Sequence, residues 1–249
     1  MGITREEMQN SKININAAYE THTGLVREAN EDALFADSTI GLWIVADGMG
    51  GHHAGEVASA LAIEEIPKSL KLGNNLSDAI QQAHTAIRNA TEQGRGGWNM
   101  GTTVVALKLE DLHYQIGWVG DSRAYCWNGV DLRRLSKDHS YVQLLLDQGL
   151  ISEAEVATHP SRNLISQGLG VGGIDGKTIK VDVVEGDLSL GETLLLCSDG
   201  LTGEVDDESI SSILAETEDN ALRVGNLIAA ALVAGGSDNV TVILVTPEA

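Results

Sequence analysis

Residues 103–127 read TVVALKLEDLHYQIGWVGDSRAYCW and hold three short apolar segments joined by very few residues. The segments 103–109, 113–119 and 124–127 are rich in β-branched and aromatic residues, which favour strands. Glu110 and Asp111 lie in the first connection, which is too short to contain a crossover helix. Because parallel strands need about a dozen connecting residues, this stretch predicts an antiparallel sheet.

Outside this stretch, strand patterns and helical patterns occur in blocks. Further apolar strand patterns lie at 42–46, 193–197 and 240–245. Helical patterns cover 54–66, 76–90 and 221–234. The first helix is expected to end at Pro67, because proline disrupts a helix interior. Blocks of helices and antiparallel hairpins predict an α+β layered sandwich rather than a doubly wound sheet.

The chain of 249 residues fits one large domain, and no internal repeat or clear linker divides it. We therefore expect a single domain over residues 1–249. Its least regular part is 140–176, where Ser152 and Glu155 form a capping box for a short helix. The stretch SRNLISQGLGVGG (161–173) follows, and its glycines and polar residues predict a surface flap.

The formal net charge of -20 argues against two classes of partner. Proteins that grip nucleic acid or an anionic membrane use clustered Lys and Arg, so we expect neither partner. An acidic surface fits metal ions or cationic partners, and it also fits a plain solvated surface. The charge alone therefore narrows the function without identifying it.

Cysteine use and apolar patterning bear on location. Cys126 and Cys197 lie far apart inside apolar segments, which predicts two buried thiols in a reducing compartment rather than a disulfide. The N-terminal stretch MGITREEMQN shows no apolar signal region, and no apolar run approaches the length of a membrane span. We expect a soluble, cytoplasmic protein that acts as a monomer.

Acidic residues recur where apolar strands end. The stretch VADGMGGHHAGE (45–56) places Asp47 at the end of a strand, before glycines that let backbone approach a ligand closely. Asp-Gly is a common turn dipeptide, so this pattern alone is weak. It recurs, however, at four further places: Asp199 in LLLCSDG, Asp238 in GGSDNVTVILV, Asp121 in WVGDSRAY, and Glu31 and Asp32 in REANEDA.

If the two sheets pack face to face, these acids can gather at one rim. Carboxylates without compensating Lys or Arg repel one another and raise their own pKa values, so a cation is expected among them. Oxygen ligands suit hard ions such as Mg²⁺ or Mn²⁺ better than Zn²⁺. Two such ions at about 3.5 to 4 Å generate hydroxide from a bridging water and hold an anionic substrate, which is phosphate-ester chemistry.

The ordered set RxxNED, VADGMGGHxxGE, GTT, VGDSR, CSDGL and SDNVTV, spread over 27–242, resembles the metal-dependent protein phosphatase family of type 2C, its bacterial serine/threonine branch in particular. The resemblance covers almost the whole chain. It implies two antiparallel β-sheets packed as a central sandwich with helices on both outer faces. It also implies a flap at 140–176 that influences substrate choice.

The resemblance implies a role for each acid of the set. Asp47 would bridge two Mn²⁺ or Mg²⁺ ions, with the carbonyl of Gly48 on one ion and Asp199 and Asp238 on the other. Glu31 and Asp32 match acids that contact an ion or orient its waters, and Asp121, with Asp199, matches a site for a third ion. Arg27 matches the arginine that clamps the substrate phosphate, for which its forked donors are suited.

One position departs from many eukaryotic members of this family. Met49 stands where they carry a histidine that protonates the leaving group, so the general acid is unassigned. His52 or a water on a metal ion could serve, but a structural role for one of His52 and His53 and solvation of the other explain the pair as well. Thr102 and Thr103 are interpreted as residues at a strand start near the site, and EVDDE (204–208) as a helix N-terminus. Ser122 and His139 could suggest a Ser/His pair, but the G-x-S-x-G nucleophile motif is absent, so this pair is discounted.

The resulting hypothesis is a metal-dependent phosphatase that hydrolyses phosphoserine and phosphothreonine in proteins by attack of a metal-bridging hydroxide. Its partners would be phosphorylated proteins, the targets of a serine/threonine kinase. A catalytically silent member that binds phosphoproteins as a scaffold is the alternative from another class, although such a member is expected to have lost acids that this chain keeps. A hydrolase of small phosphate esters also remains open.

Overall fold

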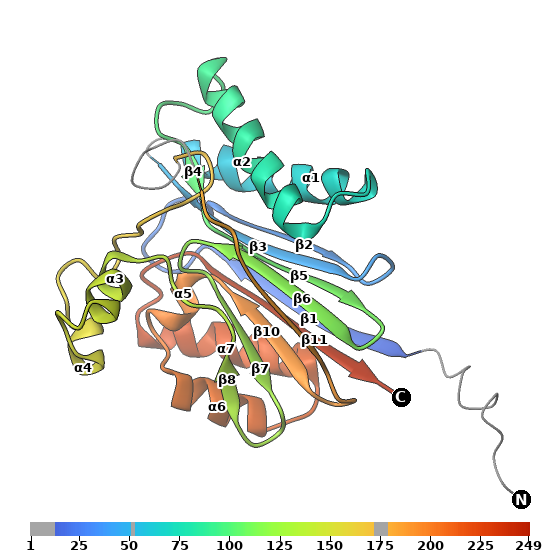
Figure 1. The fold of residues 1–249 in the computed structure, drawn as a ribbon. Helices are drawn as coiled ribbons and strands as arrows, with labels where there is room; N and C mark the ends of the chain where they lie inside the picture. Colours follow the sequence, from blue (N-terminus) through green and yellow to red (C-terminus); the bar gives the residue numbers. More distant parts are fainter. Residues whose placement is uncertain (1–12, 51–52, 172–178) are drawn as a thin grey trace, which may run out of the picture.

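The computed structural model describes residues 13–50, 53–171 and 179–249. Among these residues the strands form two antiparallel sheets (Figure 1). The five-stranded sheet has the order β1 (Asn14–His22), β11 (Val240–Glu248), β10 (Thr193–Cys197), β7 (Arg123–Trp127) and β8 (Leu132–Arg134). The six-stranded sheet has the order β2 (Asp32–Asp37), β3 (Leu42–Met49), β5 (Val104–Glu110), β6 (His113–Val119) and β9 (Asp182–Asp187), with β4 (Gly101–Thr102) paired to β3.

Helices cover the outer face of each sheet (Figure 1). The six-stranded sheet carries α1 (Ala54–Lys71) and α2 (Leu76–Glu92), and the five-stranded sheet carries α5 (Asp199–Thr202), α6 (Asp207–Ala215) and α7 (Asn220–Ala234). Two short helices, α3 (Tyr141–Asp147) and α4 (Glu153–Val156), lie to one side of the sandwich in the flap. The predicted α+β sandwich with helices on both outer faces is confirmed.

The apolar runs are continuous because the central strands are buried on both faces. In β3, Trp43 and Val45 pack between the two sheets, whereas Ile44 and Ala46 pack beneath α1 and α2. In β10, Leu194 and Leu196 face the other sheet, and Leu195 faces the helices below. A strand of this kind leaves no room for a charge until it reaches the end of the sandwich. Asp47, the first acid after the apolar run of β3, therefore lies at the rim of the sandwich.

The helix predicted over 54–66 does not end at Pro67. Instead α1 continues through Pro67 to Lys71, with Ile66 and Pro67 both buried. Packing of this face offsets the cost of the hydrogen bond that proline cannot donate. The acidic run at 204–208 is, as predicted, a helix start: Asp206 caps α6 by accepting the Ser209 N–H at 2.8 Å.

The flap leaves the sandwich after β8 and returns to it before β9. Its base is closed by pairing of Ser140 with Ile165 and by a hydrogen bond from the Tyr141 N–H to the Leu164 carbonyl at 2.7 Å. The capping box of Ser152 and Glu155 begins α4 as predicted. Residues 172–176, the end of the predicted flap, lie outside the described residues.

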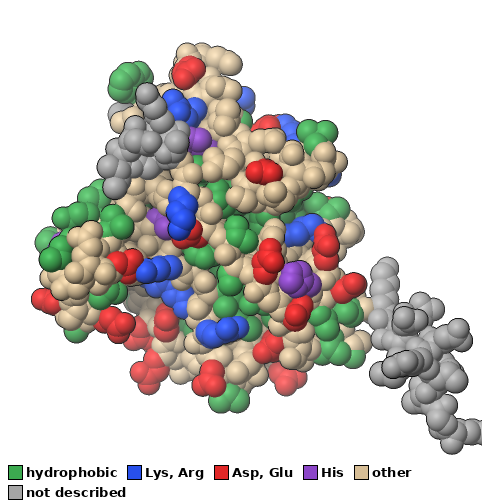
Figure 2. Space-filling model, in the orientation of Figure 1, with side chains coloured by type: hydrophobic (Ala, Val, Ile, Leu, Met, Phe, Trp, Pro, Cys, Tyr) green, Lys and Arg blue, Asp and Glu red, His purple; other side chains and the backbone are tan. Residues whose placement is uncertain are grey.

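The surface reflects the excess of acids. Acidic side chains line the lower edge of the face drawn in Figure 2, and Lys and Arg side chains across its middle lie next to acidic ones. Cys126 and Cys197 are both buried and unpaired, as predicted. Within the part of the chain that the structure describes, no helix combines the length and the apolar character that a membrane span requires.

Candidate active site

A pocket of about 260 Å³ lies at the rim where ends of both sheets meet. Seven separate stretches of the described chain contribute to it, around residues 27–31, 47–50, 103, 121, 163–165, 199 and 238–239. Seven of its lining residues are residues for which the sequence predicts a role at the site: Arg27, Glu31, Asp47, Gly48, Asp121, Asp199 and Asp238. The predicted gathering of these acids at one rim is therefore what the fold produces.

Strand pairing brings Asp32 and Asp47 together, because they are register partners in β2 and β3. Asp32 lies behind the pocket wall and is only 9% exposed. One of its oxygens, Oδ2, accepts hydrogen bonds from the hydroxyls of Ser198 at 2.8 Å and Thr241 at 2.6 Å. The other, Oδ1, is buried without a hydrogen-bond partner.

Two threonines hold the backbone of Asp47 in place. The Asp47 N–H donates to Thr103 Oγ1 at 3.1 Å, and the Asp47 carbonyl accepts from Thr102 Oγ1 at 2.9 Å and from the Thr103 N–H at 2.8 Å. Thr103 Oγ1 also lies 2.7 Å from Ser122 Oγ. These hydroxyls satisfy the backbone where β3 leaves the sheet, and they fix the direction of the Asp47 carboxyl group.

Asp199 reaches the pocket because β10 turns into α5 immediately before it. The turn passes very close to the start of β11, and a Cβ on Gly200 would lie 2.0 Å from the Asn239 carbonyl oxygen. Only glycine permits this approach, which places Asp199 beside the Asp238 loop. Asp199 Oδ1 is buried and has no hydrogen-bond partner.

Asn239 fastens the segment that carries Arg27 and Glu31. Its amide nitrogen donates to the carbonyls of Thr23 at 2.8 Å and Ala29 at 2.9 Å, and its Oδ1 accepts the Glu31 N–H at 2.7 Å. Asn239 lies within the SDNVTV motif, but the sequence predicts no role for it. Its place before a strand was the only signal available, because its partners lie 208 to 216 residues away.

Burial and mutual repulsion raise the pKa values of the pocket carboxyls. Burial, and then the charges of Asp32, Asp199 and Asp121, hold the pKa of Asp47 well above its ordinary value. Burial also raises the pKa of Asp199, with the charge of Asp238 adding to it, and raises that of Asp121 strongly. For Asp32, burial outweighs the two hydroxyl donors and raises the pKa to about 7. The cluster therefore lacks positive charge.

Among the described residues that line this pocket, Arg27 is the one Lys or Arg, and its guanidinium is paired with an acid. Its Nη2 lies 2.6 Å from Asp238 Oδ2, and this hydrogen bond raises the pKa of the guanidinium further. Asp238 thus faces an arginine rather than the other acids. Accordingly, no three His, Cys, Asp or Glu side chains in the described ranges form a ready-made cage for an ion.

The residues nevertheless fit divalent ions. The donors are carboxylate oxygens and one carbonyl, which hard ions prefer. Two orphaned buried oxygens, Asp32 Oδ1 and Asp199 Oδ1, and the raised pKa values all point to missing positive charge. Release of Asp238 from Arg27 would free a further carboxylate for the same purpose.

The remaining candidates have different surroundings. Met49 lines the pocket and its methyl group contacts the flap end near Gly168. His53 is exposed and lies 3.3 Å from Glu56, whereas His52 lies outside the described residues. Within the described residues, Ser122 Oγ lies 2.7 Å from Thr103 Oγ1, and His139 Nδ1 accepts the Gly120 N–H at 3.2 Å. These contacts do not support a Ser/His pair.

A second, larger pocket of about 610 Å³ adjoins the first and shares Asp121, Asn163 and Asp199 with it. Flap residues such as Val142, Leu146 and Val156 form one wall, and residues of α5 and α6 form the other. A ligand in the first pocket could extend directly into the second.

Comparisons with known proteins agree with this geometry. The sequence model of the Protein phosphatase 2C family matches residues 25–233. The serine/threonine phosphatase stp of Listeria monocytogenes is 36% identical over 93% of this chain and 95% of its own. The crystal structure of the Mycobacterium tuberculosis serine/threonine phosphatase PstP/Ppp is 35% identical and superposes with a TM-score of 0.85, covering 96% of this chain and 100% of its own.

A second structure of similar fold is the catalytic domain of the serine/threonine protein phosphatase PstP in complex with two manganese ions, with a TM-score of 0.83, 33% identity, and coverage of 96% of this chain and 100% of that one. The family match begins two residues before Arg27, ends within the last turn of α7 and spans well over half of this chain. The chain belongs to the protein phosphatase 2C family.

Proposed function

We propose that this protein is a metal-dependent phosphatase that hydrolyses phosphoserine and phosphothreonine in proteins. The observation that carries the proposal is the convergence of Asp32, Asp47 and Asp199 at one rim, with two buried carboxylate oxygens that have no partner. A scaffold protein has no need for this arrangement, because clustered buried carboxyls destabilise the fold in the absence of a cation.

Two Mn²⁺ or Mg²⁺ ions fit the site, and Asp47, the carbonyl of Gly48, Asp199 and Asp238 are the groups that would hold them. Glu31 and Asp32 would support these ligands, and Asp121 with Asp199 would hold a third ion; that Glu31 and Asp121 line the same pocket and that Asp32 pairs with Asp47 supports these roles. Such ions supply an activated water near neutral pH and neutralise the charge of a phosphate ester. The manganese complex of the similar PstP domain supports this assignment.

Arg27 would bind the phosphate group. It is 53% exposed at the pocket mouth, so its guanidinium can turn from Asp238 to a phosphate oxygen without crossing the core. Its two parallel donors match a phosphoryl group and orient it toward the acids behind. Asp238 would in turn be free to hold an ion, so binding of the ions and binding of the phosphate would favour each other.

We also propose the finer features that the sequence suggests. The substrates would be phosphorylated proteins, the targets of a serine/threonine kinase, and neither nucleic acid nor a membrane would be a partner; the charge of -20 supports this. Two buried, unpaired cysteines support a cytoplasmic location. Residues 1–249 would act as a single domain, as a monomer, with the flap at 140–176 contacting the substrate.

Phosphate release from a phosphothreonine peptide with Mn²⁺ tests the activity. We expect release by the wild type, and loss of at least about 100-fold in Asp47→Asn and Asp199→Asn, as for removal of central electrostatic groups. Asp37→Asn, on the same strand as Asp32 but away from the pocket, is the matched control and should keep wild-type activity. Full activity in EDTA, or in both pocket variants, would contradict the proposal.

Calorimetric titration with Mn²⁺ separates the enzyme from a silent scaffold. Binding of two ions by the wild type, weakened in Asp47→Asn, supports the enzyme. Absence of ion binding together with retained binding of a phosphopeptide would favour the scaffold.

A further inference from the structure

His139 connects the flap to the turn that carries Asp121. It directly precedes the flap, and its side chain is only 10% exposed. Its N–H donates to the Gly120 carbonyl at 2.9 Å, and its own carbonyl accepts the Ser166 N–H at 2.7 Å. One residue therefore joins the start of the flap and its returning segment at Ser166 to Gly120, the neighbour of Asp121.

The imidazole ring of His139 also joins the Asp121 turn to the flap. Nδ1 accepts hydrogen bonds from the Gly120 N–H at 3.2 Å and from the Gln167 amide nitrogen at 2.8 Å. The orientation of Gln167 is fixed independently, because its Oε1 accepts the Lys180 N–H at 3.0 Å and its nitrogen also faces the Lys180 carbonyl at 3.2 Å. With two donors on Nδ1, the ring proton belongs on Nε2, which faces Asp182 Oδ2 at 3.2 Å.

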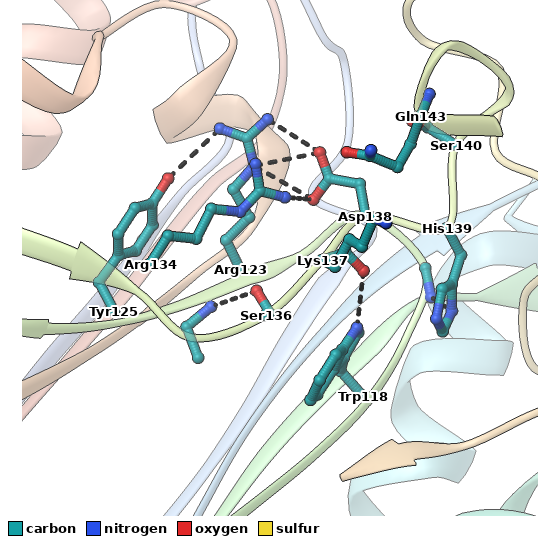
Figure 3. Close-up of polar contacts among 12 residues, drawn as sticks. Trp118, Arg123, Tyr125, Arg134, Ser136, Lys137, Asp138, His139, Ser140 and Gln143 are labelled. Atoms are coloured by element: carbon teal, nitrogen blue, oxygen red, sulfur yellow. Dashed lines mark hydrogen bonds and ion pairs between the residues drawn. The ribbon is translucent and has the colours of Figure 1, made fainter. Parts of the chain in front are cut away.

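Packing holds the ring in this orientation. The Trp118 ring stacks on it with centroids 6.3 Å apart and 24° between the planes. The indole N–H of Trp118 donates to the Lys137 carbonyl at 2.8 Å (Figure 3). Burial lowers the pKa of His139 against the opposing effect of Asp182, which favours the neutral ring that these contacts require.

The preceding residue anchors the same segment to the other sheet. The Asp138 carboxylate lies between the guanidinium groups of Arg123 and Arg134 (Figure 3). Arg123 Nη2 donates to Asp138 Oδ2 at 2.9 Å and Arg123 Nη1 to the Tyr125 hydroxyl at 3.3 Å. Residues 137–139 are therefore fixed to strands of both sheets, and the flap is the part that extends from this fixed base.

We infer that His139 is a positioning residue for substrate recognition: it fixes the start of the flap and its returning segment, at Ser166 and Gln167, against the Asp121 turn and so sets the shape of the larger pocket beside the metal site. This inference rests on the proposed function. The larger pocket, about 610 Å³, lies between the flap and α5 and α6 and opens into the smaller one through Asp121, Asn163 and Asp199. A phosphorylated side chain occupies the smaller pocket, and the adjoining polypeptide of the substrate then lies in the larger one.

Two substrates of different size separate positioning from chemistry. An aryl phosphate such as p-nitrophenyl phosphate needs the smaller pocket alone, whereas a phosphothreonine peptide also extends along the flap. For His139→Leu we expect the KM of the peptide to rise about tenfold, as for loss of one net hydrogen bond that orders the flap. The kcat values, and the kcat/KM of the aryl phosphate, should change less than about twofold.

A conservative variant and a matched control complete the kinetic test. In His139→Asn the side-chain amide oxygen can take the place of Nδ1 as acceptor, so the peptide KM should return to within about threefold of wild type. His113→Leu removes another contact between a histidine and an acid of β9, His113 Nδ1 to Asp187 Oδ1 at 2.9 Å, far from the flap, and should behave as wild type.

Hydrogen exchange in the metal-free protein gives a readout that is independent of catalysis. The amide of Ser166 and its neighbours should exchange faster in His139→Leu than in wild type or His113→Leu, while the melting temperature shows that the variant is folded. Equal loss of activity on both substrates, no rescue by His139→Asn, or unchanged exchange would overturn the inference. If the wild type hydrolyses neither substrate, the proposed function fails, and the exchange comparison still decides the role of His139.

Discussion

Asp32→Asn is predicted to stabilise the metal-free protein. The Asp32 carboxyl is 9% exposed, and burial raises its pKa to about 7, against an ordinary value of 3.8. Both hydroxyl donors, from Ser198 and Thr241, reach the same oxygen, Oδ2. An asparagine carbonyl oxygen can accept both hydrogen bonds while removing the charge. The variant therefore isolates the electrostatic cost of the buried carboxylate.

The size and sign of this effect follow from linkage. A pKa of about 7 in the folded state and 3.8 in the unfolded chain corresponds to about 4 kcal/mol, at about 1.4 kcal/mol per pKa unit. Because the pKa of Asp32 is higher in the folded state than in the unfolded chain, its contribution to stability is fully present below pH 3.8 and is lost as the pH rises through about 7. The advantage of Asp32→Asn is thus largest above pH 7 and narrows toward pH 5.

Urea unfolding in EDTA, followed by tryptophan fluorescence between pH 5 and 8, measures this difference. Asp37→Asn is the control on the same strand, because hydrogen bonds from Thr39 lower the pKa of Asp37 and its substitution should not stabilise the protein. The reasoning is refuted if Asp32→Asn is less stable than wild type at pH 8, or if the gap between them is independent of pH.

Three further predictions concern the same rim. Arg27→Ala should lower kcat/KM for a phosphopeptide about 100-fold, because the transition state loses one positively charged partner. Calorimetry should show that the variant binds Mn²⁺ at least as tightly as wild type, because Asp238 loses the partner that lies 2.6 Å away. Mn²⁺ should raise the melting temperature more at pH 8 than at pH 6. Burial and neighbouring acids raise the pKa values of Asp47 and Asp199, so protons compete with the ions for these carboxylates more strongly at the lower pH. Gly200→Ala should lower the free energy of unfolding in urea by at least about 2 kcal/mol, because the new Cβ would lie 2.0 Å from the Asn239 carbonyl oxygen. Gly225→Ala, within α7 and with open space around the new Cβ, should raise it by up to about 1 kcal/mol.

The sequence predicted the buried strands well, because their apolar runs are long and end sharply in acids. The segment 113–119 is β6 and the segment 193–197 is β10. Less regular strands escaped notice. β1 has a largely polar sequence, NINAAYETH, and is only half buried, so its pairing with all nine residues of β11 is a long-range effect. The helix α1 passes through Pro67 for the same reason, since tertiary packing outweighs local preference.

For the site, the acids could be named from the sequence, but their contacts could not. Repetition of an acid after a strand was visible locally. The pairing of Arg27 with Asp238, and the hydroxyls of Ser198 and Thr241 on Asp32, join residues 166 to 211 positions apart, so they depend on how the two sheets meet. From the sequence, His139 was interpreted as a structural or exposed residue without ligand spacing, because its partners come from the turn at Gly120, the flap and β9.

The most direct test of the central claim is anomalous diffraction at the manganese edge from crystals grown with Mn²⁺. Two strong peaks should lie in the pocket between Asp47 and Asp199, with Asp238 turned away from Arg27 toward one of them. Crystals that show no manganese in this pocket at saturating Mn²⁺, with the Arg27 and Asp238 pair intact, would contradict the account.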